Sequence, residues 1–164
     1  MLIEGKVIKY GDDINTDVII PGKYTKTLNI QELAVHAMED LDLNFKNKVK
    51  KSNILVAGFN FGCGSSREQA VLALKYSGVV CIIAKSFARI FYRNAINIGL
   101  TLIECNTDKI DEGNILKYKL GSSVLSNLST GKYIDINPLP KIMVEILAKG
   151  GLINYIKSKN KHEL

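Results

Sequence analysis

The chain has 164 residues, a length that favours one domain with a single core. Its composition, 46% hydrophobic and 23% charged, is that of a globular protein rather than a disordered or fibrous one. The formal charge of +6 is compatible with an anionic substrate, an acidic partner or plain solubility, so it excludes little.

The first third predicts one strand, one loop and one helix. Residues 3–10 alternate imperfectly between apolar and polar side chains, as a strand does. Residues 11–17 are polar and unsuited to a core element, so we expect a loop there. Residues 30–41 carry apolar side chains at helical spacing.

The middle of the chain predicts strands that alternate with helices. In order we expect strand 54–59, helix 66–77, strand 79–84, helix 87–98 and strand 100–104, with Gly78 and Gly99 ending the two helices. The strands are apolar throughout, which is typical of strands buried on both faces. This pattern predicts βαβ units with right-handed crossovers in a largely parallel central sheet.

The last third changes in character. Residues 115–120 and 132–136 read as strands around turns at Gly121 and Gly131, and a C-terminal helix follows over 141–157, interrupted at residues 150–151. The predicted fold is therefore a single α/β domain over residues 1–164, with additional strands and a C-terminal helix.

Several features bear on location and partners. No uncharged apolar stretch approaches the ~20 residues of a membrane span. The first residues lack a basic segment followed by an apolar run, so we expect no signal peptide and a cytoplasmic location. Residues 157–161 hold much of the positive charge, and we interpret them as a solvated tail rather than a nucleic-acid-binding patch.

The three cysteines, Cys63, Cys81 and Cys105, are scattered, and no two have CxxC spacing. Their odd number and the lack of a secretory signal argue against a disulfide framework. Cys81 lies inside an apolar run, which is the usual place for an unreactive core cysteine. We therefore expect that this chain alone binds no metal.

Residues 62–68, with the sequence GCGSSRE, lie where a predicted strand gives way to a helix. The first amides of a helix have no intrahelical partner and carry partial positive charge, so they attract anions. Gly62 and Gly64 would let a ligand approach the backbone. Arg67 adds a planar guanidinium suited to a carboxylate. Together these features predict a carboxylate site.

Other interpretations of the same residues remain open. Ser65 and Glu68 fit a capping box, which stabilises a helix by about 1 kcal/mol and needs no ligand. A non-catalytic anion-binding module would use the same helix N-terminus. A serine hydrolase would need a histidine base, and both His36 and His162 are better explained as solvated or structural side chains. No phosphate-binding glycine motif is present.

Three segments resemble a known family in the order in which that family has them. Residues 62–70 (GCGSSREQA) resemble the G-S-S-R-E motif of the mobile, swivelling domain of aconitase-type enzymes. Residues 86–94 (SFARIFYRN) resemble its S-F-A-R-I-F segment with the following asparagine, and residues 12–19 (DDINTDVI) resemble the D-D-I-N-T-D signature of its free-standing small subunits. The similarity spans essentially the whole chain.

The resemblance implies roles for residues of this sequence. Ser65 would be the base that takes a proton from a substrate carbon, and Ser66 and Arg67 would bind a substrate carboxylate. Asp17 would belong to the polar groups of the catalytic site. On local sequence alone, Asp17 is also explained as a turn or cap residue.

The resemblance also implies partners. In this family a large subunit holds a [4Fe-4S] cluster, whose iron acts as a Lewis acid on the substrate hydroxyl. The chain would then form a heterodimer with that large subunit, and it would be inactive alone. Its partners would be that subunit and a hydroxy-carboxylate substrate, with no nucleic acid and no membrane.

Substrate choice in this family is associated with a loop after the first signature, here residues 22–27 with Tyr24, Lys26 and Thr27 as candidate substrate-binding residues. Homoaconitase-like relatives have Y-L-R-T there, and isopropylmalate enzymes tend to have an apolar group. Lys26 departs from both patterns, since a lysine can pair with a carboxylate but lacks the fork. We prefer 3-isopropylmalate because it is the commonest substrate of this form, with homoaconitate and 2,3-dimethylmalate as alternatives.

Overall fold

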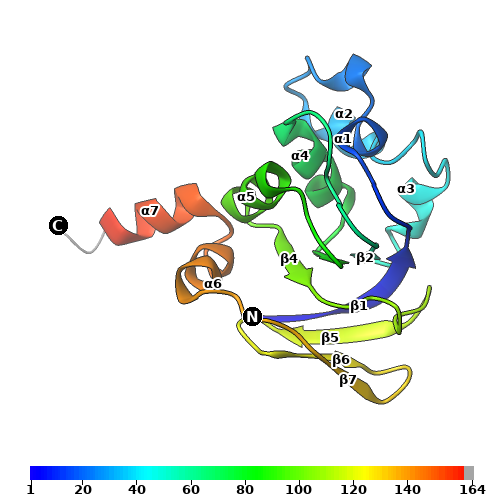
Figure 1. Cartoon of the computed structure of the whole chain (residues 1–164). Helices are drawn as coiled ribbons and strands as arrows, with labels where there is room; N and C mark the ends of the chain where they lie inside the picture. Colours follow the sequence, from blue (N-terminus) through cyan, green and yellow to red (C-terminus); the bar gives the residue numbers. More distant parts are fainter. Residues whose placement is uncertain (161–164) are drawn as a thin grey trace.

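A computed structural model describes residues 1–160 of the chain, so His162 and its neighbours lie outside it (Figure 1). The strands of the described part form one sheet in the order β4-β3-β2-β1-β5-β6-β7. In chain order they are β1 (Leu2–Lys9), β2 (Ile54–Val56), β3 (Cys81–Ala84), β4 (Thr101–Glu104), β5 (Ile115–Lys119), β6 (Val124–Asn127) and β7 (Lys132–Asp135).

Strands β2 to β4 pair in parallel, as predicted, and β1 also pairs in parallel with β2. Helices make the connections: α4 (Glu68–Ser77) joins β2 to β3, and α5 (Arg89–Ile98) joins β3 to β4. Between β1 and β2 lie α1 (Thr16–Ile19), the 3-10 helix η1 (Gly22–Tyr24), α2 (Ile30–Val35) and α3 (Phe45–Lys48). The sheet and helices confirm the predicted α/β class with βαβ units.

Strand β5 runs antiparallel to β1, and β6 and β7 continue the sheet in antiparallel fashion. Strand β6 was not predicted, because two of its four residues are polar and break the apolar pattern. Its last residue, Asn127, is buried and donates to the side-chain oxygen of Asn114 at 2.8 Å. This hydrogen bond therefore satisfies the buried side-chain amide of Asn127, a polar residue that local sequence would predict to be exposed.

Alternate residues of the parallel strands enter two cores. Leu55 and Ile82 pack under the helices α1 to α5 on one face. Ile54 and Ile83 pack on the other face with residues of β5, β6 and α6 (Lys141–Ala148). Cys81 lies in this second core, where burial strongly raises the pKa of its thiol, and this confirms the expected core cysteine.

The helix predicted over 30–41 and the predicted C-terminal helix differ from the observed helices in where they end. The helix predicted over 30–41 ends at Val35, since Met38 adopts a left-handed conformation (φ 61°) and its amide donates to the Ile19 carbonyl at 2.8 Å. The C-terminal helix is interrupted as predicted, with α7 (Leu152–Asn160) following α6 and projecting from the body (Figure 1). Lys157, Lys159 and Asn160 are exposed and Ser158 is half-buried, and residues 157–160 continue the helix rather than form an irregular tail. No helix within residues 1–160 is long and apolar enough to span a bilayer.

Candidate active site

Three loops meet at the carboxyl edge of the parallel strands. They follow β1, β2 and β3, which are neighbours in the sheet, so their loops emerge side by side. The loop after β2 bonds to both others: the Gly62 amide donates to the Ile14 carbonyl at 2.8 Å, and the Ala88 amide donates to the Phe61 carbonyl at 2.9 Å. The three resembling segments, far apart in sequence, are thereby joined.

The serine-containing segment forms a turn and bends, and it is not helical. Thr16 holds it from α1, since its amide donates to the Cys63 carbonyl and its hydroxyl to the Ser65 carbonyl, both at 2.8 Å. Helix α4 therefore begins only at Glu68, after an N-cap residue, Arg67, that makes no side-chain capping bond. The capping-box interpretation is wrong, because these tertiary bonds keep Ser65 outside the helix.

The two glycines of the segment serve different purposes. Gly62 has φ +79°, and a Cβ there would lie 2.2 Å from Cγ of Phe91. Its missing side chain thus admits a packed aromatic ring rather than a ligand. Gly64 has φ +90°, and the nearest atom to its Cβ position is the Thr16 hydroxyl at 3.4 Å. Only Gly64 leaves the space that close ligand approach requires.

Arg67 and Asp17 form an ion pair, with Nη1 and Oδ1 2.5 Å apart. The arginine is 21% exposed and also donates to the Ile20 carbonyl at 3.4 Å. Asn15, not Asp17, caps α1, accepting from the Val18 amide at 2.9 Å. Asp17 therefore lies in the first turn of α1, where it orients Arg67, and the cap role considered for it belongs to Asn15.

A cavity of about 310 Å³ opens between these loops. Its polar lining residues are Thr16, Ser65, Ser66, Arg67, Arg89 and Asn94, and Ala88, Ile90 and Phe91 add apolar surface. Ser65, Ser66 and Arg67 were predicted from sequence. Arg89 and Asn94 were recognised only as part of the S-F-A-R-I-F resemblance, without a role. Among the lining residues there is no histidine or carboxylate, which leaves Ser65 without the base of a serine hydrolase.

Tyr24, Lys26 and Thr27 do not line this cavity. The Tyr24 ring stacks on the His36 ring, with centroids 4.0 Å apart and an interplanar angle of 10°. The Thr27 hydroxyl donates to Glu32 at 2.7 Å, and Lys26 is exposed. The three residues thus occupy a neighbouring loop, and His36, as expected, has a structural role.

Contacts on two sides hold that loop in place, and one of them joins it to the first turn of α4. The Gln69 side-chain amide, in the first turn of α4, donates to the Thr25 carbonyl at 3.0 Å. On the other side, His36 Nδ1 lies 2.6 Å from Glu39 Oε2. Burial raises the pKa of Glu39, but bonds from His36 and Tyr24 outweigh it, so the net pKa is below the ordinary value. The loop is anchored beside Arg67 rather than free.

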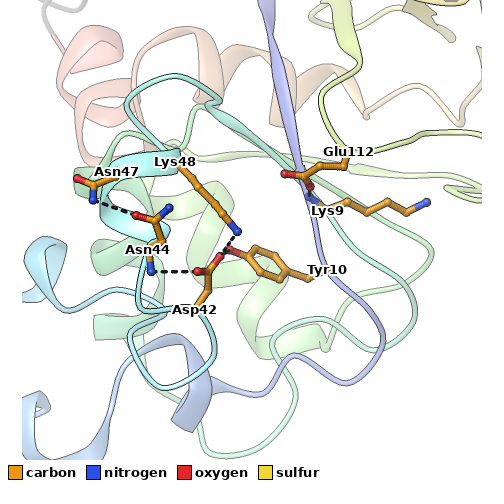
Figure 2. Close-up of polar contacts among 7 residues, drawn as sticks. All are labelled: Lys9, Tyr10, Asp42, Asn44, Asn47, Lys48 and Glu112. Atoms are coloured by element: carbon orange, nitrogen blue, oxygen red, sulfur yellow. Dashed lines mark hydrogen bonds and ion pairs between the residues drawn. The ribbon is translucent and has the colours of Figure 1, made fainter.

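Asp42 anchors the segment between β1 and β2 at the end of β1 (Figure 2). It accepts from the Tyr10 hydroxyl at 2.9 Å, from Lys48 Nζ at 2.7 Å and from the Asn44 amide at 3.0 Å. Burial raises the pKa of Asp42, and the hydrogen bonds from Lys48 and Tyr10 lower it below its ordinary value overall. The cluster joins the α2–α3 segment to the residue before the first site loop.

Within residues 1–160, no three His, Cys, Asp or Glu side chains gather as a metal site. Cys63 lies between the two site glycines, where burial and the nearby Asp13 carboxylate raise the pKa of its thiol. The pKa of Cys105 is raised to about 11 by burial. Both groups are therefore neutral thiols near pH 7 rather than thiolates.

Comparison with known proteins agrees with this geometry. The model of the Aconitase C-terminal domain family matches residues 10–108, which contain all three site loops. The chain belongs to this family. Among its members, the 3-isopropylmalate dehydratase small subunit of Caldanaerobacter subterraneus subsp. tengcongensis is 55% identical over 159 residues, covering 96% of this chain and 99% of that one.

Two further comparisons are with Methanocaldococcus jannaschii. The methanogen homoaconitase small subunit is 52% identical over 159 residues, covering 97% of this chain and 94% of that one. A crystal structure named 3-isopropylmalate dehydratase superposes with a TM-score of 0.93 at 50% identity, covering 99% of this chain and 98% of that one. Because members with two substrate names have similar identity, substrate choice has to be argued from individual side chains.

Proposed function

We propose that this chain is the small subunit of a hydro-lyase that isomerises 2-isopropylmalate and 3-isopropylmalate by dehydration and rehydration, in leucine biosynthesis. The main support for this proposal is the cavity in which Ser65, Ser66 and the Asp17-bound Arg67 meet loops from two neighbouring strands. Family members named for this activity, similar over nearly the whole chain, support it. The whole chain, residues 1–164, acts as one swivelling domain.

Ser65 takes the proton from the substrate carbon, and the substrate loses its hydroxyl from the adjacent carbon. A free hydroxyl is a very poor base, so its deprotonated form needs nearby positive charge. Arg67 and the uncapped N-terminus of α4 supply that charge beside the cavity. Ser66 and Arg67 bind the substrate carboxylate, and Asp17 orients the Arg67 guanidinium.

The cofactor is assigned to a partner. The described cysteines do not assemble a ligand set for an iron–sulfur cluster, because no three His, Cys, Asp or Glu side chains gather within residues 1–160 and Cys81 is buried in the sheet core. We assign a [4Fe-4S] cluster to a large subunit, with which this chain forms a cytoplasmic heterodimer. The isolated chain is inactive. In the heterodimer it acts on a small hydroxy-carboxylate, and neither nucleic acid nor a membrane takes part.

The loop with Tyr24, Lys26 and Thr27 meets the distal end of the substrate. Its bond through Gln69 to α4 places it beside Arg67. A second candidate substrate is homoaconitate, because Lys26 is an exposed cation on that loop and a homoaconitase small subunit is 52% identical. The lysine would pair with the additional carboxylate of such a substrate. 2,3-Dimethylmalate is a third possibility that needs no cation at Lys26.

The test is anaerobic purification with the large subunit of the same organism, followed by rates on 3-isopropylmalate, homocitrate and 2,3-dimethylmalate. We expect the highest kcat/KM on 3-isopropylmalate. Ser65→Ala should lower kcat by roughly 10²- to 10⁴-fold, as loss of a positioned base does.

Ser126→Ala, on β6 away from the site loops, is the matched control and should retain full activity. An active Ser65→Ala complex would show that Ser65 is not the base. Tight carboxylate binding by the isolated chain, with no turnover in the complex, would favour a non-catalytic anion-binding module instead.

A further inference from the structure

We propose that Arg89 binds the second carboxylate of a dicarboxylate substrate, in the cavity that contains Ser65 and Arg67. The inference rests on the proposed function and extends it, since it assigns a second cationic subsite to a residue on another element. Arg89 is exposed and is the first residue of α5, whereas Arg67 precedes α4. Both arginines line the same cavity.

The charges of the two arginines are not equivalent. Arg67 is paired with Asp17 at 2.5 Å, so much of its positive charge is compensated within the chain. Arg89 takes part in none of the six ion pairs found among residues 1–160. No carboxylate lines the cavity beside it. Arg89 is therefore the lining cation whose charge remains available to an anion.

A dicarboxylate needs more than the Arg67 subsite. One guanidinium already engaged by Asp17 cannot neutralise two substrate carboxylates, and a second guanidinium offers a further planar fork. The residues next to Arg89 are Ala88, Ile90 and Phe91, which contribute apolar surface, and Ile90 is 49% exposed. The chemical class that fits is a small dicarboxylate with an aliphatic branch lying against Ile90.

Arg93 provides a matched comparison on the same helix. It is exposed, one turn after Arg89, and also outside the six ion pairs. Arg93 lines a different groove, between α5 and α6, to which Arg89 also contributes, and it does not line the Ser65 cavity. A general effect of charge on α5 would act through both arginines, and a carboxylate subsite only through Arg89.

The experiment uses the complex with the large subunit and the variants Arg89→Gln, Arg89→Lys and Arg93→Gln, with 3-isopropylmalate as the probe. We expect KM to rise roughly 10- to 100-fold in Arg89→Gln, the loss of one charge-assisted contact. Arg89→Lys should recover part of the loss, and Arg93→Gln should stay within about twofold of wild type. The large-subunit concentration that gives half-maximal activity should not change.

A second readout does not need turnover. Arginine modification by phenylglyoxal, mapped by mass spectrometry on the complex, should be slowed by 3-isopropylmalate at Arg89 and not at Arg93. Protection of Arg89 in a complex that converts none of the three substrates would overturn the proposed function and support the subsite.

Two results would overturn the Arg89 subsite itself. One is equal KM changes in Arg89→Gln and Arg93→Gln with no protection of Arg89. The other is a loss in Arg89→Gln that disappears at saturating large subunit, which would make Arg89 an interface residue.

Discussion

The two halves of the sheet differ in burial and in what they carry. Strands β2 and β3 are buried at every position, whereas β5 alternates and β7 is mostly exposed. Parallel neighbours require long crossovers, while antiparallel strands are joined by short turns. The long loops of β1 to β3 hold every predicted site residue, and β5 to β7 hold none. The parallel connections, rather than the sheet itself, therefore supply the room for chemistry.

The largest difference between the halves should appear at two glycines. Gly62→Ala in the parallel half places a methyl group against Phe91 in a left-handed backbone, and we expect a loss of about 2–5 kcal/mol in the free energy of unfolding. Gly131, in the β6–β7 turn, also has a positive φ (+71°), but no atom lies within 4 Å of its Cβ position. Gly131→Ala should therefore lower the free energy of unfolding by only about 1 kcal/mol. Urea denaturation measures both, and equal losses would refute the packing role of Gly62.

A smaller and pH-dependent difference is expected at Asp42. Its pKa is lowered in the fold, so its stabilising bonds are present above the unfolded pKa of about 3.9 and are lost as the pH falls through the lower folded value. Asp42→Asn should therefore cost about 1–3 kcal/mol at pH 7, and its deficit relative to wild type should shrink below about pH 4. Urea denaturation at pH 7 and in acid tests this, and a deficit independent of pH would contradict the assignment.

The smallest effect is expected in the antiparallel half. Lys117 on β5 lies 3.6 Å from Glu4 on β1, and both side chains are about half exposed (43% and 50%). Exposed pairs contribute little, so Lys117→Ala should change the free energy of unfolding by less than about 1 kcal/mol. Addition of salt should reduce that small difference further, because salt screens exposed charges. A loss as large as that of Asp42→Asn would remove the contrast between the two halves.

Much of the fold could be predicted because it depends on local patterns. Apolar runs typical of buried strands alternate with predicted helices, and this order indicated the parallel half. Glycines marked the ends of α4 and α5. The family was recognisable because three motifs occur in order, and the match over residues 10–108 confirms it. The roles of Ser65, Ser66, Asp17 and the loop with Lys26 remain predictions to be tested by activity.

The errors occurred where long-range bonds override local preference. Ser65 and Glu68 have the spacing of a capping box, but Thr16 holds Ser65 in a non-helical segment before α4. The helix predicted over 30–41 stops early because the Met38 amide bonds to Ile19 instead of continuing a helical turn. Thr16 and Ile19 both lie far from the residues whose pattern predicted those helices, so the local sequence could not show these bonds.

Hydrophobic period and backbone preference alone predict the order of strands and helices from β2 to β4, the burial of Cys81 and the glycine- and serine-rich segment before α4. Only the tertiary structure decided that Asp17 pairs with Arg67, that Phe91 occupies the space above Gly62, and that Arg89 shares a cavity with Ser65. The physical reason is that these contacts join loops of three different strands, whose proximity comes from parallel pairing in the sheet.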